Sequence, residues 1–454
     1  MLASGLCFII IVIVIAILIM LFILTDYYYH YYFVTAYASE KQNNNKGPII
    51  YDPSLKVELI FKGLQHPTSM AFLGPNDILV LEKDQGTVHR IINGKILPEP
   101  LLDVNVANKN ERGMLGIAVA KHQKGPTYVF LYYTEAAKKD GEDITKGKEP
   151  LGNRLYRYEL ADNKLINPKL LLDLPANPGS RHNGGRIKIG PDNNIYLVIG
   201  DVSGYLKAKT RTVDLNYQNG KDSDGRGGIL RITQDGKPVG NGIIGNNTPA
   251  NKYYAYGIRN SFGMDFDPVT KKLWDTETGP TFGDEINLVE PGFNSGWRKV
   301  QGIWKFDNNN KDVIGKMELN PDGLLVDFGG KGKYSSPEFI WYYPVGPTAL
   351  TFLNSSKLGK QYENDMFVGD INNGYIYHFD LKEKNRIKLA LDNLLLEDKI
   401  ANNENETKSI IFGEGFAENK DSFRGISDIE VGDDGYLYII SFGQGTIYRI
   451  IPAR

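Results

Sequence analysis

The polar residue that points most directly to chemistry is His182, which stands between Arg181 and an Asn-Gly-Gly turn. The segment "IKIGPDNNIYLVIG" follows this turn, and the strand it predicts is succeeded directly by Asp201. Because an imidazole titrates near neutral pH, His182 in such a turn could accept a proton as a general base. The simpler interpretation is a hydrogen-bonded loop histidine, with Asp201 capping its own turn. The segment alone is compatible with both roles.

Three other segments place reactive side chains in glycine-rich turns. "NERGMLGIAV" contains Glu111, and "YGIRNSFGMDFDP" contains Arg259 and Asn260. The third, "TETGPTFGDEINLVEPGFNSGW", has a Gly-Pro turn followed by an acidic pair, Asp284 and Glu285. The backbone carbonyls of a turn and a nearby carboxylate are oxygen ligands that suit a hard cation. Salt bridges within the fold and solvated loop charges are the alternative interpretations.

The segments that must position these residues are short strands. Runs such as "DILVLEK", "TYVFLYYTE", "NIYLVIGD" and "YLYIISF" are rich in aromatic and β-branched residues and are bounded by Gly, Pro, Asn and Asp turns. Six copies of a turn followed by such a strand recur at irregular intervals, and this repeat predicts an all-β, six-bladed β-propeller. A pair of β-sandwiches is the alternative. In a propeller, the ends of the inner strands converge on one mouth, and the final "GTIYRIIP" strand could close the ring by pairing with strands from the first blade.

The N-terminal segment predicts a membrane helix. Phe8–Leu24 is uncharged and about long enough to cross a bilayer. "AYASE" at Ala36–Glu40 offers an alternative, a cleaved signal peptide, although the apolar core is long for one and no basic residues precede it. The aromatic cluster Asp26–Phe33 suits the headgroup region and favours an anchor. The expected organisation is an anchor or signal segment at 1–38, a polar linker at 39–50 and the propeller at 51–454.

Composition argues against a nucleic-acid partner and excludes a disulfide within one chain. Lys and Arg number 52 against 54 Asp and Glu, so the chain has no excess of positive charge for a nucleic acid, and it lacks a basic stripe interleaved with aromatic residues. The single cysteine, Cys7, excludes a disulfide within one chain.

Taken in order, "ERGMLG", "HNGGRIKIGPDNNIYLVIGD", "YGIRNSFGMDFDP" and "ETGPTFGDEINLVEPGFNSGW" resemble the glucose/sorbosone dehydrogenase family over roughly residues 55–452. This family includes soluble quinoprotein glucose dehydrogenase and the aldose sugar dehydrogenases. The resemblance implies a six-bladed propeller that binds pyrroloquinoline quinone (PQQ) and calcium at its mouth. It also implies oxidation of the anomeric hydroxyl of an aldose to a lactone.

The resemblance assigns roles to matching residues. His182 would be the general base that takes the hydroxyl proton, and Asp201 would hold its imidazole. Arg259 and Asn260 match a pair at the cofactor, where the cation would stabilise charge on the reduced quinone. Glu111 takes the place of a glutamine that contacts the cofactor.

The resemblance also implies two calcium sites. Gly279 and Pro280 match the two backbone carbonyls that bind the calcium of the cofactor, and this ion would polarise the quinone as a Lewis acid. Glu285 and the backbone of Ser295 match a second, structural site.

The sequence departs from the family where cations normally bind the cofactor carboxylates. Asn372 stands in place of a lysine, and Gly425 and Ser427 stand in place of two arginines. Burying the three carboxylates of PQQ without paired cations is costly. The nearby cations that could replace them are Arg112, Arg181 and Arg424.

The leading hypothesis is a membrane-anchored quinoprotein aldose dehydrogenase with its propeller outside the cytoplasm, or a secreted one if the N-terminal segment is cleaved. It would pass electrons to an external acceptor. One alternative is a calcium-dependent, lactonase-type hydrolase, for which only Glu285 is well placed. The other is a non-catalytic propeller that binds a glycan or a protein.

Overall fold

The computed structural model describes residues 47–136, 150–203, 211–306, 314–317, 321–382, 385–391, 393–418 and 424–453. The expected membrane segment, Phe8–Leu24, lies outside these residues, as does most of the expected linker. Among the residues that are described, no helix has the length and hydropathy needed to cross a membrane.

The described strands form seven sheets, of which six have four to six strands and one has three. The first sheet contains β3 (Pro67–Gly74), β4 (Asp77–Glu82), β5 (Thr87–Ile92), β6 (Lys95–Ile96) and β7 (Leu102–Asp103). The second contains β8 (Met114–Ala120), β9 (Thr127–Glu135), β10 (Gly152–Ala161) and β11 (Lys164–Leu174). The third contains β12 (Ile187–Ile189), β13 (Ile195–Ile199), β14 (Gly228–Ile232), β15 (Tyr253–Tyr256), β19 (Phe293–Asn294) and β23 (Lys333–Tyr334).

The remaining sheets follow in chain order. The fourth contains β16 (Ser261–Phe266), β17 (Leu273–Glu277), β18 (Asp284–Val289), β24 (Phe339–Trp341) and β29 (Ile400–Ala401). The fifth contains β25 (Pro347–Phe352), β26 (Met366–Asp370), β27 (Ile376–Lys382), β28 (Lys388–Ala390), β30 (Ile411–Glu414) and β1 (Ile49–Ile50). The sixth contains β31 (Ile426–Val431), β32 (Leu437–Ser441), β33 (Thr446–Pro452) and β2 (Leu55–Lys62). The small sheet contains β20 (Val300–Gln301), β21 (Trp304–Phe306) and β22 (Ile314–Met317).

Helices are short in the part of the chain that the structure describes. The α-helix α2 covers Glu404–Lys408. The 3-10 helices are η3 (Val213–Leu215), η4 (Ala250–Lys252), η5 (Asp322–Leu324), η6 (Lys360–Tyr362) and η7 (Leu394–Leu396).

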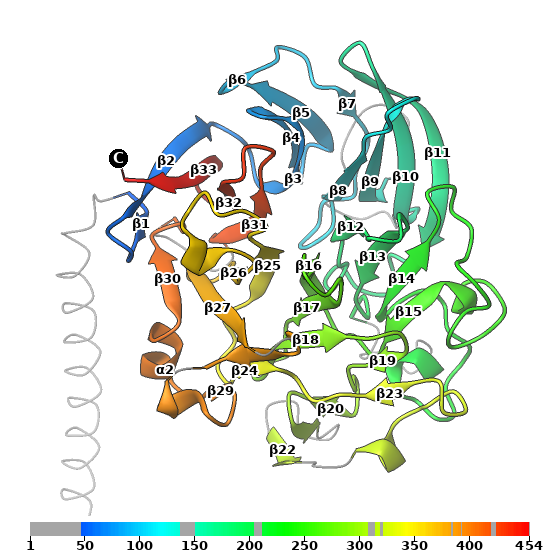
Figure 1. The fold of residues 1–454 in the computed structure, drawn as a ribbon. Coiled ribbons are helices and arrows are strands. Elements are labelled where there is room, and N and C mark those ends of the chain that lie inside the picture. Colours follow the sequence, from blue (N-terminus) through cyan, green and yellow to red (C-terminus); the bar gives the residue numbers. More distant parts are fainter. Residues whose placement is uncertain are drawn as a thin grey trace, which may run out of the picture. The chain divides into compact units, whose positions relative to one another are not determined.

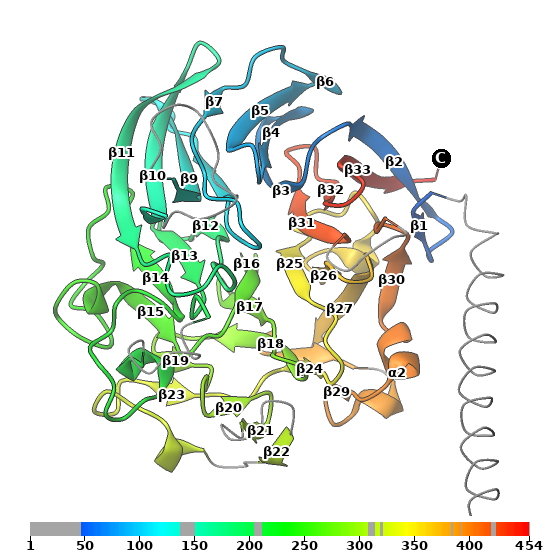
Figure 2. The ribbon, with the colours of Figure 1, turned by 180° about the vertical axis from the view of Figure 1, so that it is seen from behind.

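The first strands of the six larger sheets form a closed ring. β3 packs against β8, β8 against β12, β12 against β16, β16 against β25, β25 against β31, and β31 against β3. Figures 1 and 2 show the sheets radiating from this ring when it is seen from either side. The fold is therefore an all-β propeller, as the repeat predicts, and the alternative of paired β-sandwiches is wrong.

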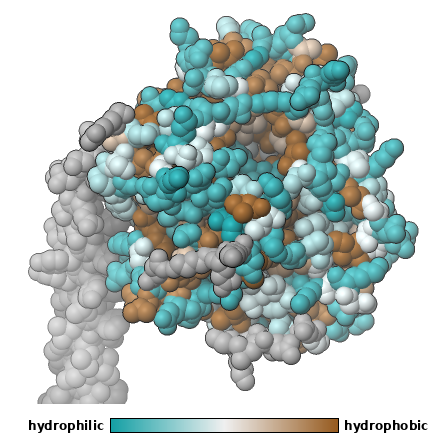
Figure 3. All heavy atoms as spheres, in the orientation of Figure 1, coloured by the Kyte–Doolittle hydropathy of each residue, from teal (hydrophilic) through white to brown (hydrophobic). Residues whose placement is uncertain are grey.

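The second strand of each sheet is largely buried because neighbouring sheets cover both of its faces. All five residues of β13 are buried, as are all five of β17, β26 and β32. A strand buried on both faces is a nearly continuous hydrophobic run rather than an alternating one. This explains runs such as "IYLVI" and "LYIIS". On the face of the molecule that Figure 3 shows, hydrophilic residues predominate and hydrophobic ones are scattered among them.

The two ends of the propeller chain close the ring together. β33 pairs antiparallel with β2, from Leu55 opposite Pro452 to Lys62 opposite Thr446. The last strand therefore pairs with an N-terminal strand, but β2 belongs to the sixth sheet, so the expected pairing with strands of the first blade is wrong. Ile49–Ile50, at the end of the expected linker, form β1 and pair with β30.

Antiparallel pairing brings two kinds of loop to the same end of the ring. One precedes the first strand of a sheet and the other follows its second strand. Glu111, His182 and Asn260 precede β8, β12 and β16, and Asp201 follows β13. The strand order therefore gathers residues from three sheets at one mouth.

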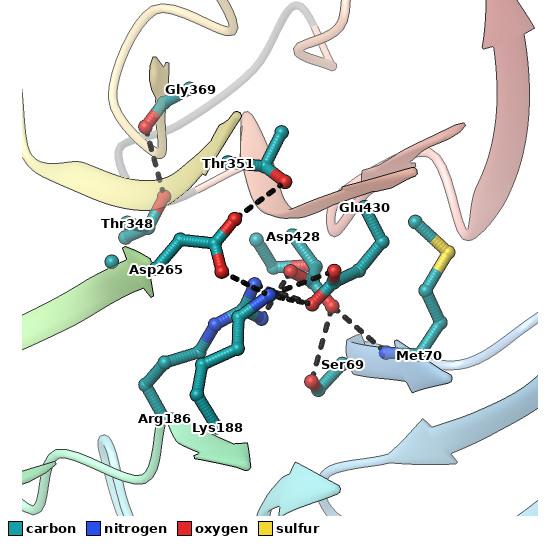
Figure 4. Close-up of polar contacts among 12 residues, drawn as sticks. Ser69, Met70, Arg186, Lys188, Asp265, Thr348, Thr351, Gly369, Asp428 and Glu430 are labelled. Atoms are coloured by element: carbon teal, nitrogen blue, oxygen red, sulfur yellow. Dashed lines mark hydrogen bonds and ion pairs between the residues drawn. The ribbon is translucent and has the colours of Figure 1, made fainter. Parts of the chain in front are cut away.

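The interior of the ring holds a network of charged side chains (Figure 4). Arg186, immediately before β12, donates to Asp428 and, at 2.6 Å, to Glu430, both of β31. Lys188 of β12 lies 2.9 Å from Glu430 and 3.4 Å from Asp265 of β16. This network was not predicted from the sequence. Its signal is the alternation of charged and apolar residues in "RIKI" and "SDIEV", which places every second side chain on the inner face.

Candidate active site

His182 and Asp201 form a buried pair. His182 Nδ1 lies 2.6 Å from Asp201 Oδ1, with 7% of the His182 side chain and none of the Asp201 side chain exposed. Gly200 makes this approach possible, because a Cβ built there would lie 2.4 Å from the carbonyl oxygen of Arg259 and 2.8 Å from that of His182. The structure therefore brings together two residues that stand nineteen positions apart.

Asp201 is held by donors on both carboxylate oxygens. Its Oδ1 also accepts from Ser203 N at 2.8 Å, and its Oδ2 accepts from Trp297 Nε1 at 2.8 Å. Burial raises the pKa of the Asp201 carboxyl, but His182, the charge of Arg259 and the indole hydrogen bond outweigh burial and leave that pKa below its usual value. Asp201 is therefore a fixed carboxylate at neutral pH.

Glu111 connects two of the loops at the mouth. Its Oε2 accepts from the backbone N of His182 at 2.5 Å and from Asn260 Nδ2 at 3.4 Å. Asn260 is 3% exposed, and its Oδ1 has no hydrogen-bond partner among the described residues. A buried polar atom without a partner is costly unless a ligand or water supplies one. Asn260, which Glu111 links to His182, therefore presents Oδ1 as an unused hydrogen-bond acceptor.

Arg259 is anchored by its neighbours, but one N–H donor of its guanidinium group has no partner among the described residues. Its Nη1 donates to Thr278 O at 2.6 Å, its backbone N donates to Glu277 Oε1 at 2.7 Å, and its Cζ lies 5.5 Å from the centroid of the Trp297 ring. Its buried Nε has no partner in the described part of the chain. Arg259 is thus a positioned cation with spare donor capacity, and its carbonyl accepts from Asp201 N at 2.9 Å.

The Gly279-Pro280 turn is clamped by Asp284. Gly279 N donates to Asp284 Oδ1 at 2.8 Å, and Asp284 Oδ2 accepts from Val345 N at 2.8 Å and Gly346 N at 2.7 Å. Burial raises the pKa of the Asp284 carboxyl to about 6, although these three bonds oppose the rise. Asp284 therefore fixes the turn by accepting from the backbone amide of Gly279.

Glu285 lies directly opposite Glu277 on the neighbouring strand. Each of these two side chains is 1% exposed, and Ser295 Oγ donates to Glu277 Oε2 at 2.6 Å. Glu285 accepts from Gln301 Nε2 at 2.8 Å and from the backbone N of Gly302. Burial and the charge of Asp275 raise the pKa of Glu277 to about 8, and burial and the charge of Glu277 raise that of Glu285.

Two such buried carboxyl groups need a shared proton or a cation, and carboxylates are ligands that calcium prefers. This donor chemistry fits the expected structural site, and it adds Glu277 between Glu285 and Ser295. Glu277, which stands two residues before Gly279, was not predicted from the sequence because only strand register reveals it. In the described ranges, no group of three or more His, Cys, Asp and Glu side chains is arranged to hold a metal ion.

The three positions that depart from the family are used for packing between loops. A Cβ at Gly425 would lie 2.5 Å from Asp370 O, so no larger side chain fits there. Ser427 Oγ donates to Pro67 O at 2.7 Å, and Asn372 Nδ2 lies 3.5 Å from Pro344 O.

Three arginines could replace the missing cations at the cofactor carboxylates, and two of them have partners close by. Arg112 donates to the carbonyls of Ala176 and Gly179, and so braces the loop that leads to His182. Arg424 pairs with Glu418 at 2.9 Å. Arg181 is exposed next to His182.

The chain is similar to known proteins of one family. The profile of the family described as Glucose / Sorbosone dehydrogenase matches residues 64–449. Aldose sugar dehydrogenase YliI of Escherichia coli is 24% identical over 406 residues, which cover 88% of this chain and 93% of that protein. Quinoprotein glucose dehydrogenase B of Acinetobacter calcoaceticus is 30% identical over 266 residues, which cover 54% of this chain and 52% of that protein.

A solved structure shares the fold. The PQQ-bound form of aldose sugar dehydrogenase from Streptomyces coelicolor has a TM-score of 0.59 at 21% identity, covering 88% of this chain and 99% of that chain. Since the family profile spans most of the sequence, the chain belongs to the glucose/sorbosone dehydrogenase family.

Proposed function

We propose that this protein is a PQQ-dependent aldose dehydrogenase that oxidises the anomeric hydroxyl of a sugar to a lactone. In this proposal the six larger sheets are the six blades of the propeller. The observation that carries it is the convergence of the His182–Asp201 pair with Arg259, Asn260 and Glu111 at one mouth. The PQQ-bound relative and the quinoprotein relative support the choice of cofactor.

His182 is the general base in this proposal. A carboxylate that accepts from Nδ1–H selects the tautomer in which Nε2 carries the lone pair, so Nε2 takes the proton of the anomeric hydroxyl. Asp201 then stabilises the imidazolium that forms, at a separation of 2.6 Å. The fixed charge of Asp201 therefore lowers the cost of the proton transfer.

Arg259, Asn260 and Glu111 hold the cofactor in this proposal. PQQ, when bound, supplies the electrophile that accepts a hydride from the sugar carbon. Arg259 brings a fixed cation with an unused Nε donor to the place where negative charge develops, and Asn260 brings an unused Oδ1 acceptor. An external acceptor would reoxidise the cofactor.

Calcium completes the proposed site. The carbonyls of Gly279 and Pro280 would hold the ion of the cofactor, and Glu285, Glu277 and Ser295 would hold a structural ion. The raised carboxyl pKa values of Glu277 and Glu285 support a cation near this pair. Phe8–Leu24 would anchor the protein in a membrane with the propeller outside the cytoplasm, or would be part of a cleaved signal.

A second candidate, a non-catalytic propeller that binds a glycan or a protein, is favoured by one observation. The family positions that bind cofactor carboxylates are Asn372, Gly425 and Ser427 here, and the tight packing at Gly425 excludes a cation there. Fewer cations would then offset the charge of PQQ.

One experiment separates the two candidates. The purified full-length protein is incubated with PQQ and calcium, and the quinone absorbance and sugar-dependent reduction of a dye are measured. Dye reduction that disappears in His182→Gln, with quinone absorbance retained, supports the dehydrogenase. A wild type that binds no quinone and oxidises no aldose supports the binding propeller.

A further inference from the structure

Trp297, in the loop between β19 and β20, contacts two members of the proposed site, Asp201 and Arg259. Its side chain is 1% exposed and packs with Leu215 and Phe282. Its indole Nε1 donates to Asp201 Oδ2, the oxygen that does not face His182. Its ring face lies 5.5 Å from the guanidinium carbon of Arg259.

The backbone of Trp297 is fixed from both sides. Its N donates to Gly257 O at 2.9 Å, and its O accepts from Asn216 Nδ2 at 2.8 Å. Asn216 and Asn294 exchange a reciprocal pair of side-chain hydrogen bonds at 2.9 Å, and Asn294 also accepts from Gly296 N at 3.0 Å. The indole is therefore held in one orientation by a buried polar cluster that does not belong to the mouth itself.

We propose that Trp297 is a positioning residue that fixes the Asp201 carboxylate and the Arg259 guanidinium relative to each other. Through Asp201, it also tunes the basicity of His182. This inference rests on the proposed function. It concerns a side chain that contacts Asp201 and Arg259 and acts through these two neighbours.

The direction of the effect follows from charge. An N–H donor on Oδ2 draws negative charge away from Oδ1, so the carboxylate stabilises the imidazolium less than it otherwise would. Removing the donor stabilises the imidazolium, and the neutral base then requires a higher pH. The other charged groups that face the pair stay in place; they are Glu111 at the His182 backbone, Arg259 and Arg226 beside Asp201, Arg298 over the indole and the exposed Arg181.

Two substitutions separate the two contacts. Trp297→Phe keeps an aromatic face for Arg259 and removes the N–H, whereas Trp297→Leu removes both. Trp304→Phe is the matched control, since Trp304 packs on the same cluster with its ring 6.0 Å from that of Phe282. For Trp297→Phe we expect the acid limb of the kcat/KM profile to move up by about 0.5–1 pH unit, which is about a 3- to 10-fold loss on that limb. Trp297→Leu should lose kcat further, and Trp304→Phe should keep the wild-type limb.

A measurement without turnover tests the same inference. In full-length wild-type protein, the indole N–H resonance of Trp297, assigned with Trp297→Phe, should shift as the pH carries His182 through its titration. The shift should disappear in His182→Gln, because both side chains bond to one carboxylate. This test stays valid if Trp297→Phe fails to fold, since Trp274→Phe, Trp304→Phe and Trp341→Phe can assign the other indoles, and it stays valid if no sugar is oxidised.

The outcomes are distinct. An indole resonance that follows His182 together with an upward shift of the acid limb supports the role of Trp297. An indole resonance that ignores His182, or an acid limb in folded Trp297→Phe that matches wild type, overturns it. Absence of aldose oxidation in wild type with a responsive indole contradicts the proposed function alone.

Discussion

Replacing Asp201 by asparagine tests how one buried carboxylate serves the base. The carboxylate accepts from His182 Nδ1 at 2.6 Å and Ser203 N at 2.8 Å on one oxygen, and from Trp297 Nε1 at 2.8 Å on the other. An amide has only one acceptor oxygen. In Asp201→Asn the NH₂ group must therefore face either the indole N–H or the donors of His182 and Ser203.

These contacts set the size of two expected losses in Asp201→Asn, one in folding free energy and one in kcat. One buried donor left facing another donor costs about 1–3 kcal/mol of folding free energy. Loss of the charge that orients and stabilises the imidazolium should cost about 100- to 10,000-fold in kcat, the usual range for a disabled general base. The acid limb of the remaining activity should move to lower pH, because the imidazolium has lost its counter-charge.

The assay compares two variants of the full-length protein. Asp365→Asn is the matched control, since Asp365 is 5% exposed and bonds to His378 Nε2 at 2.7 Å at the opposite end of β26 from the mouth. Urea unfolding gives the free energies of unfolding, and dye reduction with PQQ and calcium gives kcat. Both variants should lose stability, and only Asp201→Asn should lose turnover. An Asp201→Asn protein that binds quinone and keeps more than about a tenth of kcat would refute the reasoning, because removal of positioned acid–base catalysis costs at least about 100-fold.

Other predictions test the remaining parts of the site. His182→Gln should keep the fold and quinone absorbance and lose about 100- to 10,000-fold in sugar oxidation, and Arg259→Lys should also lose activity because an ammonium lacks the planar donor fork; steady-state kinetics checks both. Because the pKa of Glu277 is raised from 4.5 to about 8, the metal-free protein should lose stability as the pH rises through that window, and melting curves should show that Glu277→Gln lessens the loss and that calcium offsets it. A melting temperature unchanged by chelator at pH 8 would contradict the structural calcium site. The full-length protein should sediment with membranes and a variant lacking residues 1–46 should be soluble, whereas an intact preparation that begins at Ser39 would indicate a cleaved signal.

Much of the fold is predictable from sequence because a propeller repeats one local pattern. The turn-plus-strand repeat and the apolar second strands such as β13 and β32 are set by burial on both faces, and this burial is visible in the pattern of hydrophobic residues. The pairing of "GTIYRIIP" with β2 is less accessible, since it joins residues nearly four hundred positions apart. The expected boundary at residue 51 also overlooks β1, whose two residues are too short to carry a pattern.

The candidate site is predictable only where a motif marks it. His182, Asp201, Arg259 and Asn260 stand in glycine-rich turns that the sequence displays, and the structure brings them together. Glu277 emerges only from strand register, because a carboxylate in "LWDTE" has no periodic signal of its own.

The charged network inside the ring and the contact between Trp297 and Asp201 were not predicted for a related reason. Arg186 and Asp428 are 242 positions apart, and Trp297 and Asp201 are 96 positions apart. Such pairs depend on how whole sheets meet, and this information is spread over the entire chain.

The most direct test of the central claim is a single-turnover measurement with an aldose deuterated at the anomeric carbon. The full-length protein, loaded with PQQ and calcium, is mixed with the labelled or unlabelled sugar while quinone absorbance and lactone are followed together. The proposal predicts one lactone per quinone reduced and a slower reaction with the deuterated sugar, since the bond to the anomeric hydrogen breaks. Quinone that stays oxidised while no lactone forms, in protein that binds PQQ, would contradict it.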